Sequence, residues 1–98
     1  MDIALSLYGR TFATRERARE VLNIADPLPW AADAPCLDLS GVMASPSFMA
    51  ELLNQLAVRH LSIVVIGGSD YLQDLTNSLV ERLGLSGRVR IGDEATYA

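Results

Sequence analysis

The residue types that carry most enzyme chemistry are sparse in this chain of 98 residues. It has one histidine, His60, one cysteine, Cys36, and no lysine. Schiff-base catalysis and P-loop phosphate binding both need a lysine ammonium group, so the sequence excludes both. One cysteine cannot form an internal disulfide, and one cysteine with one histidine supplies too few ligands for a structural zinc site. We therefore predict a protein that is not an enzyme, with no catalytic residue, no metal site and no cofactor.

Both of these residues have ordinary structural explanations. Cys36 lies beside leucines in a predicted strand, where a free thiol is usually a small buried hydrophobe. His60 falls at the end of a predicted helix, where the helix dipole favours a cation. We expect it to cap that helix at the surface and not to act as a general base.

A glycine pair offers the main alternative chemistry. Gly67, Gly68 and Ser69 follow a predicted strand and open a helix, and backbone N–H groups in that geometry can bind an anion. The chain lacks the G-x-G-x-x-G pattern, so a tight turn with a helix cap is favoured over an anion- or nucleotide-binding sensor or enzyme that uses residues 67–70. If a ligand binds, the loop at residues 42–47 should lie close by, because both loops follow strand carboxyl ends.

The charge balance disfavours nucleic acid as a partner. Eight basic and twelve acidic side chains give a formal charge of −4, which repels phosphate backbones. The only basic cluster, Arg15, Arg17 and Arg19, alternates with glutamates and is typical of a solvated helix face.

The longest apolar run, residues 63–66, is far shorter than the about 20 residues of a membrane helix, and the first residues lack the basic start of a signal peptide. These features predict a cytoplasmic protein without a membrane partner.

Hydrophobic periodicity predicts seven elements of regular structure. Alternating or β-branched runs predict strands, and apolar residues at helical spacing between N-caps and Gly or Pro stops predict helices. The predicted strands are residues 2–8, 36–39, 61–66 and 88–91. The predicted helices follow N-caps at Thr14, at Ser45 and at Ser69 or Asp70, and end near residues 25, 59 and 83.

This order of elements predicts a single α/β domain over residues 1–98. Strands separated by helices of this length are joined most easily by right-handed crossovers into a parallel sheet. We expect a four-stranded, mostly parallel or mixed sheet with helices packed on it, in which the first or last strand could run antiparallel at an edge. The proline-rich segment at residues 26–35 is expected to form a surface loop, with Trp30 folded back onto the core.

The segment at residues 37–53, L-D-L-S-G-V-M-A-S-P-S-F-M-A-E-L-L, resembles the strand-loop-helix core of the STAS superfamily, to which anti-sigma factor antagonists belong. In that superfamily a strand ending in D-L-S, here Asp38 to Ser40, enters a loop with serines and then a helix. With the upstream T-R-E-R-A at residues 14–18, the chain is more closely similar to the STAS-like family of unknown function. The residues that match its S-x-S-F-x-x-E-L helix start are Ser45, Ser47, Phe48, Glu51 and Leu52.

The resemblance implies a non-catalytic bacterial signalling module that binds a histidine-kinase-like ATPase able to act as a serine kinase. In the antagonists that partner phosphorylates a serine at the helix start, and the phosphate switches binding. Aligning D-L-S places Ser47 on the first serine of their D-S-S-G motif, Phe48 on the second, usually modified serine, and Pro46 on the aspartate. Phosphorylation at the usual position is therefore impossible here, and a shifted acceptor, Ser47 or Ser45, is the remaining option.

Residue types at the helix start also have structural explanations. Ser45 is a good N-cap, followed by a proline that suits the first helical position. Phe48 shares one helix face with Leu52 and Leu56, which favours a core anchor over a partner contact. Asp38, Ser45, Ser47 and Phe48 are the candidates for partner binding or phosphorylation, within a surface at residues 42–48. A further alternative is a self-associating unit, a homodimer paired through an edge strand.

Overall fold

The computed structural model of this protein describes residues 2–25 and 34–92. Trp30 lies outside the described residues. The strands are β1 Asp2–Ala4, β2 Thr11–Phe12, β3 Cys36–Asp38, β4 Met43–Ala44, β5 Ile63–Ile66 and β6 Val89–Gly92, and the helices are the 3-10 helix η1 Leu5–Leu7, α1 Arg15–Ala25, α2 Pro46–Arg59 and α3 Asp70–Arg82. No helix in the described ranges combines the length and the apolar character needed to cross a membrane.

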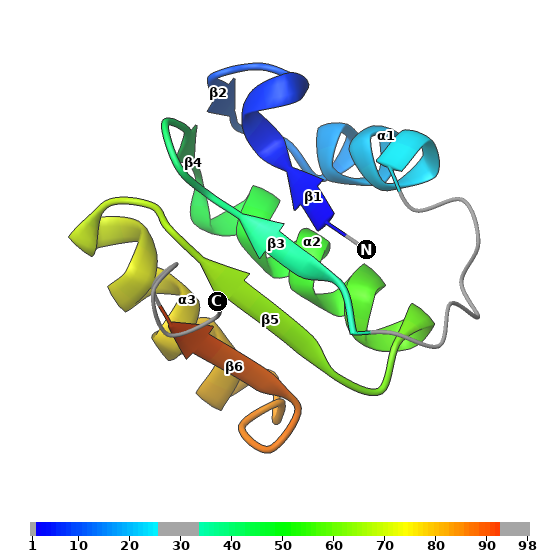
Figure 1. The fold of residues 1–98 in the computed structure, drawn as a ribbon, viewed down its shortest axis with the longest axis vertical. Coiled ribbons are helices and arrows are strands. Elements are labelled where there is room, and N and C mark those ends of the chain that lie inside the picture. The colour runs from blue at the N-terminus through cyan, green and yellow to red at the C-terminus, as the bar shows by residue number, and fades with distance from the viewer. Residues whose placement is uncertain (1, 26–33, 93–98) are drawn as a thin grey trace.

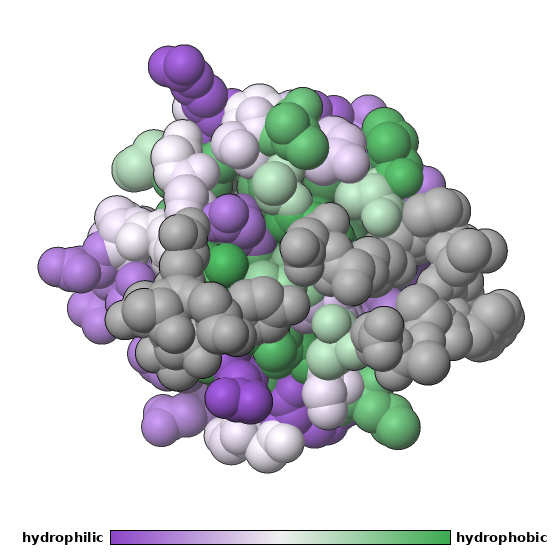
Figure 2. Space-filling view, in the orientation of Figure 1, coloured by the Kyte–Doolittle hydropathy of each residue, from purple (hydrophilic) through white to green (hydrophobic). Residues whose placement is uncertain are grey.

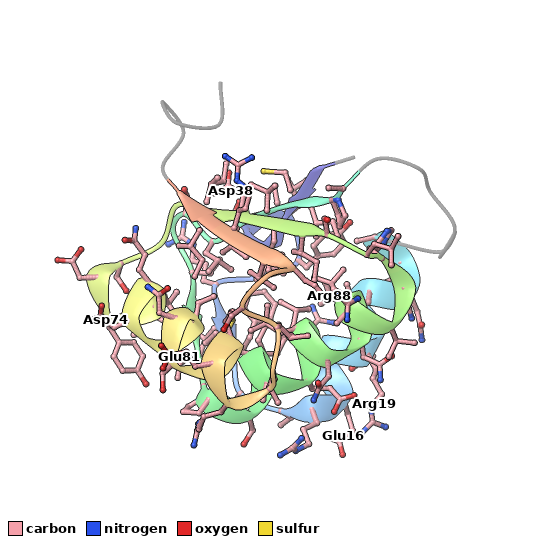
Figure 3. The ribbon with its side chains drawn as sticks, turned by 90° about the horizontal axis from the view of Figure 1, so that it is seen from below. Glu16, Arg19, Asp38, Asp74, Glu81 and Arg88 are labelled. Atoms are coloured by element: carbon pink, nitrogen blue, oxygen red, sulfur yellow. The ribbon has the colours of Figure 1, made fainter. Side chains whose placement is uncertain are left out.

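Four of the strands form one parallel sheet in the order β1-β3-β5-β6, through three pairings. The predicted α/β class is confirmed, and β5 lies inside the sheet as expected. Neither edge strand is antiparallel. Because the strand order follows the chain order, right-handed crossovers place all three α-helices on the same face of the sheet. The helices lie behind the sheet in Figure 1 and below it in Figure 3.

The first strand is shorter than the sequence predicts. The chain leaves the sheet after Ala4 and enters η1, whereas the apolar run predicted a strand over residues 2–8. It then forms β2, which pairs in parallel with β4 through Thr11 with Met43 and Phe12 with Ala44. Two-residue strands are too short to give an alternation signal, so the sequence did not indicate this small second sheet.

The core lies between the sheet and the helices. The register aligns Ile3, Leu37 and Val65 in one row, and all three side chains are buried. Leu52 and Leu56 are buried on the opposing α2, which lies between α1 and α3 and contacts both. Burial of this apolar surface is the main force that holds α2 against the sheet.

The other face of the sheet is also partly apolar. The next row of the register contains Cys36, which is buried, Val64, which is half-buried, and Arg90, which is exposed. These side chains alternate onto the face away from the helices. Figure 2 views this face and shows apolar side chains among polar ones. Apolar residues on both faces are typical of parallel strands.

The C-terminal end of α2 is capped by Arg88, which lies directly before β6. The Arg88 guanidinium donates through Nη2 to the carbonyls of Ala57 at 2.6 Å and His60 at 2.7 Å, and through Nε to that of Leu61 at 3.0 Å. These carbonyls have no partner within the helix ladder. His60 is the C-cap residue, as predicted, but only 6% of it is exposed, so the expectation of a surface position is wrong.

We expect Leu37→Ala to lower the free energy of unfolding by about 2–5 kcal/mol, because it removes a fully buried side chain from a central strand and leaves a cavity. Urea denaturation followed by circular dichroism measures this change. Val58→Ala is the matched control, since 84% of Val58 is exposed on α2. The control should change stability by less than about 0.5 kcal/mol. Equal losses in the two variants would contradict the assigned core.

Candidate functional site

All the candidate residues lie at one edge of the main sheet. Asp38 ends β3, Ser45 and Ser47 begin α2, and Gly67 follows β5. The carboxyl ends of parallel strands meet at the same edge, which is where ligands bind open α/β sheets. Within that edge the candidates divide into two groups, one around the start of α2 and one around the loop after β5.

Ser45 has the structural role that its position predicts. It is the N-cap of α2, and its Oγ accepts a hydrogen bond from the Phe48 backbone N–H at 3.1 Å. The same hydroxyl donates to the carbonyl of Ala13 at 2.9 Å. Ser45 therefore caps α2 and also ties it to the segment between β2 and α1. Both hydrogen bonds would have to change before this hydroxyl could accept a phosphate.

Phe48 is a core residue, which confirms the favoured interpretation. Its side chain is fully buried, and its ring centroid lies 4.8 Å from that of Phe12 on β2. Tilted aromatic pairs at this distance add to the stability gained from burial alone. Phe48 thus cannot contact a partner without unfolding of this packing, and its role in the site is to position the residues before it.

Ser47 is the exposed serine at this helix start. It is the second residue of α2, and its hydroxyl makes no hydrogen bond to another residue in the described part of the chain. The N–H groups of a first helical turn have no partner within the helix and carry a partial positive charge. Of the two serine candidates, Ser47 is therefore the one with an available hydroxyl.

Asp38 belongs to the second group and lies against the glycine loop. Its Oδ1 accepts a hydrogen bond from the Ser40 backbone N–H at 2.9 Å. Gly67 packs directly on this turn, because a Cβ built on Gly67 would lie 2.8 Å from Asp38 Oδ1 and 3.1 Å from the Ser40 nitrogen. The loops after β3 and β5 are thus in contact, through residues 38–40 of the first loop.

This contact explains the glycine pair structurally. Gly67 and Gly68 have φ angles of 70° and 87°, a region that side chains with a Cβ rarely adopt. Ser69 caps α3 by accepting from the Leu72 N–H at 3.2 Å. A bound anion at this loop would face the Asp38 carboxylate, which repels it. The geometry therefore favours the tight turn with a helix cap over an anion site.

A cavity at this edge was not indicated by the sequence. A cavity of about 380 Å³ is lined by Thr11, Phe12, Ala13, Met43, Ala44, Ser45 and Tyr71. It lies over the β2–β4 pair and the start of α3, and most of its lining is apolar. Met43 is 57% exposed and Tyr71 is 54% exposed, so two large apolar side chains reach solvent on the lining of one cavity. The only sequence signal was their position in segments that follow strand ends.

The arginine-rich segment is more than a solvated face. Arg15 and Arg19 on α1 lie 3.6 Å and 3.4 Å from the carboxylate oxygens of Glu51 on α2. The Glu51 side chain is only 13% exposed, so these pairs are partly shielded from solvent. Both arginines are more than half exposed, as expected for a solvated helix face, and they also connect α1 to α2.

No known family or protein helps to assign this site. No protein-family model, curated protein or solved structure matches the chain. In the described ranges no group of three histidine, cysteine, aspartate or glutamate side chains is placed to hold a metal ion. What the site offers chemically is an apolar cavity with two exposed apolar side chains and a nearby serine hydroxyl.

Ser45→Ala should lower the free energy of unfolding by about 1–2 kcal/mol, since it removes the N-cap of α2. Ser47→Ala removes an exposed hydroxyl two residues further along the chain. It should change the free energy of unfolding by less than about 0.5 kcal/mol. Chemical denaturation of both variants tests the division of roles. A larger loss for Ser47→Ala would show that the roles are reversed.

Gly67→Ala tests the contact between the two loops. At Gly41, φ is 76° and nothing lies within 4 Å of a built Cβ, so Gly41→Ala reports the backbone cost alone. That cost is about 1–2 kcal/mol. Gly67→Ala should lower stability by about 1–3 kcal/mol more, because its Cβ collides with the Asp38 turn. Equal losses in urea denaturation would mean that the loops are not packed as described.

Proposed function

We propose that this protein is a non-catalytic regulatory module that binds another protein through the surface at residues 42–48, extended by Tyr71. The observation that carries this proposal is the apolar cavity beside the start of α2, with Met43 and Tyr71 exposed at its rim. Exposed apolar side chains around a cavity are typical of protein-interaction sites. Water leaves these surfaces when a partner covers them, which drives association.

The partner that we propose is a histidine-kinase-like ATPase able to act as a serine kinase. The support is the resemblance of residues 37–53 to the antagonists of anti-sigma factors, together with the exposed hydroxyl of Ser47 beside the cavity. A phosphate on Ser47 would lie in the first turn of α2, where the helix dipole stabilises negative charge. The modified chain would stay folded while the charge on its docking surface changed, which is what a binding switch needs.

An anion- or nucleotide-binding sensor at residues 67–70 is the weaker candidate. Its glycines pack against residues 38–40, and the Asp38 carboxylate is next to Gly67. Both features are accounted for by folding alone. The exposed apolar side chains at the cavity, by contrast, take no part in a cap or a turn.

Capture from a lysate of the native host tests this function. The immobilised chain should retain a histidine-kinase-like ATPase, identified by mass spectrometry. Met43→Asp should lose it, because a carboxylate in the apolar surface must be desolvated on binding. Ser47→Asp, which imitates the phosphate, should also lose it. Incubation of the purified ATPase with the chain and ATP should then place phosphate on Ser47.

Leu61→Asp is the matched control for Met43→Asp. Leu61 is 85% exposed and lies beyond the C-terminal end of α2, far along the helix from the cavity. It should retain the ATPase as the unchanged chain does. Capture of no such ATPase, or equal capture by Met43→Asp and Leu61→Asp, would contradict the proposed function.

A further inference from the structure

The cavity surface has a fixed order of elements across it. β2 follows β1, β4 follows β3 and α3 follows β5, so β2, β4 and the start of α3 succeed one another along the carboxyl edge of the sheet (Figure 1). Thr11 lines the cavity from the first of these elements, Met43 from the second and Tyr71 from the third. The cavity thus has two opposite rims, one formed by β2 and the other by α3.

The two rims carry charges of opposite sign. On the β2 rim, Arg10 is exposed directly before Thr11, and its guanidinium forms no ion pair with a described residue. On the α3 rim, Asp70 and Asp74 flank Tyr71 and are both exposed. Figure 3 shows Asp74 pointing outward from α3. A surface with an apolar centre, one basic rim and one acidic rim is complementary to a second copy of itself.

We infer that this surface is the contact of a symmetric homodimer. A two-fold axis that lies in the interface, perpendicular to the line between the rims, places the β2 rim of one copy on the α3 rim of the other. Arg10 then faces Asp74 of the second copy, twice. The exposed part of Met43 is buried at the centre, and Tyr71, on the α3 rim, packs against the β2 rim of the other copy. Aromatic side chains buried between two proteins, next to charged residues, are typical of tight contacts.

A second copy fits this charge pattern better than a partner of a single charge sign. An acidic partner would be repelled by Asp70 and Asp74, and a basic one by Arg10, whereas the copy pairs both rims. This inference does not rest on the identity of the proposed ATPase. It adds a form of regulation, because the dimer covers the surface that the ATPase would bind, so the two associations exclude one another.

Sedimentation equilibrium of the purified chain, over about a hundredfold range of concentration, tests the dimer. The unchanged chain should show a monomer–dimer equilibrium. Tyr71→Ala should raise the dissociation constant at least about tenfold, as removal of an aromatic side chain buried in an interface often does. Leu61→Ser, an exposed apolar residue away from the cavity, should leave the constant unchanged. Circular dichroism of each variant establishes that it is folded.

A charge exchange tests the orientation of the two copies. Arg10→Asp and Asp74→Arg should each weaken the dimer about threefold to tenfold, because each places like charges opposite one another. The double variant should recover most of the association of the unchanged chain. A chain that stays monomeric at every concentration, or a dimer unaffected by Tyr71→Ala and by both single charge changes, would overturn the inference. Neither result bears on capture of the ATPase, which is measured separately.

Discussion

The arrangement of this surface depends on one junction, where the start of α2 meets the end of β2. Ser45 caps α2 and donates to the Ala13 carbonyl, while Phe48, one turn later, packs on Phe12. A hydrogen bond and a buried aromatic pair thus join two segments that are more than 30 residues apart in the chain. With the junction fixed, β4 is held beside β2, with Ala44 buried and Met43 facing solvent.

The remaining structure keeps α2 in this position. Glu51 forms ion pairs with Arg15 and Arg19 of α1, and Arg88 donates hydrogen bonds to carbonyls at the C-terminal end of α2. These polar contacts set the direction of α2 over the sheet, and apolar burial supplies most of the free energy. A rigid helix start is useful for recognition, because less conformational entropy is lost when a partner binds a surface that is already ordered.

Local signals in the sequence were enough to predict most of the fold. The Ser45-Pro46 cap, the β-branched run of β5 and the glycine stops each act through neighbouring residues, and they predicted α2, β5 and the alternation of strands and helices correctly. The cavity could not be predicted in this way. The cavity is lined by β2 and β4, which are two residues long, and its α3 rim depends on which face of α3 carries Tyr71. Such surfaces arise only from tertiary packing. The contact of Asp38 with Gly67 was missed for the same reason.

Cross-linking in cells of the native host tests most directly whether one surface binds both a second copy and the ATPase. A photo-reactive phenylalanine derivative in place of Tyr71 should form adducts upon irradiation, with a second copy of the chain and with an ATPase of the histidine-kinase type. The same derivative in place of Leu61 should form few of either. Equal yields at the two positions, or adducts at position 61 alone, would show that the functional surface lies elsewhere on the molecule.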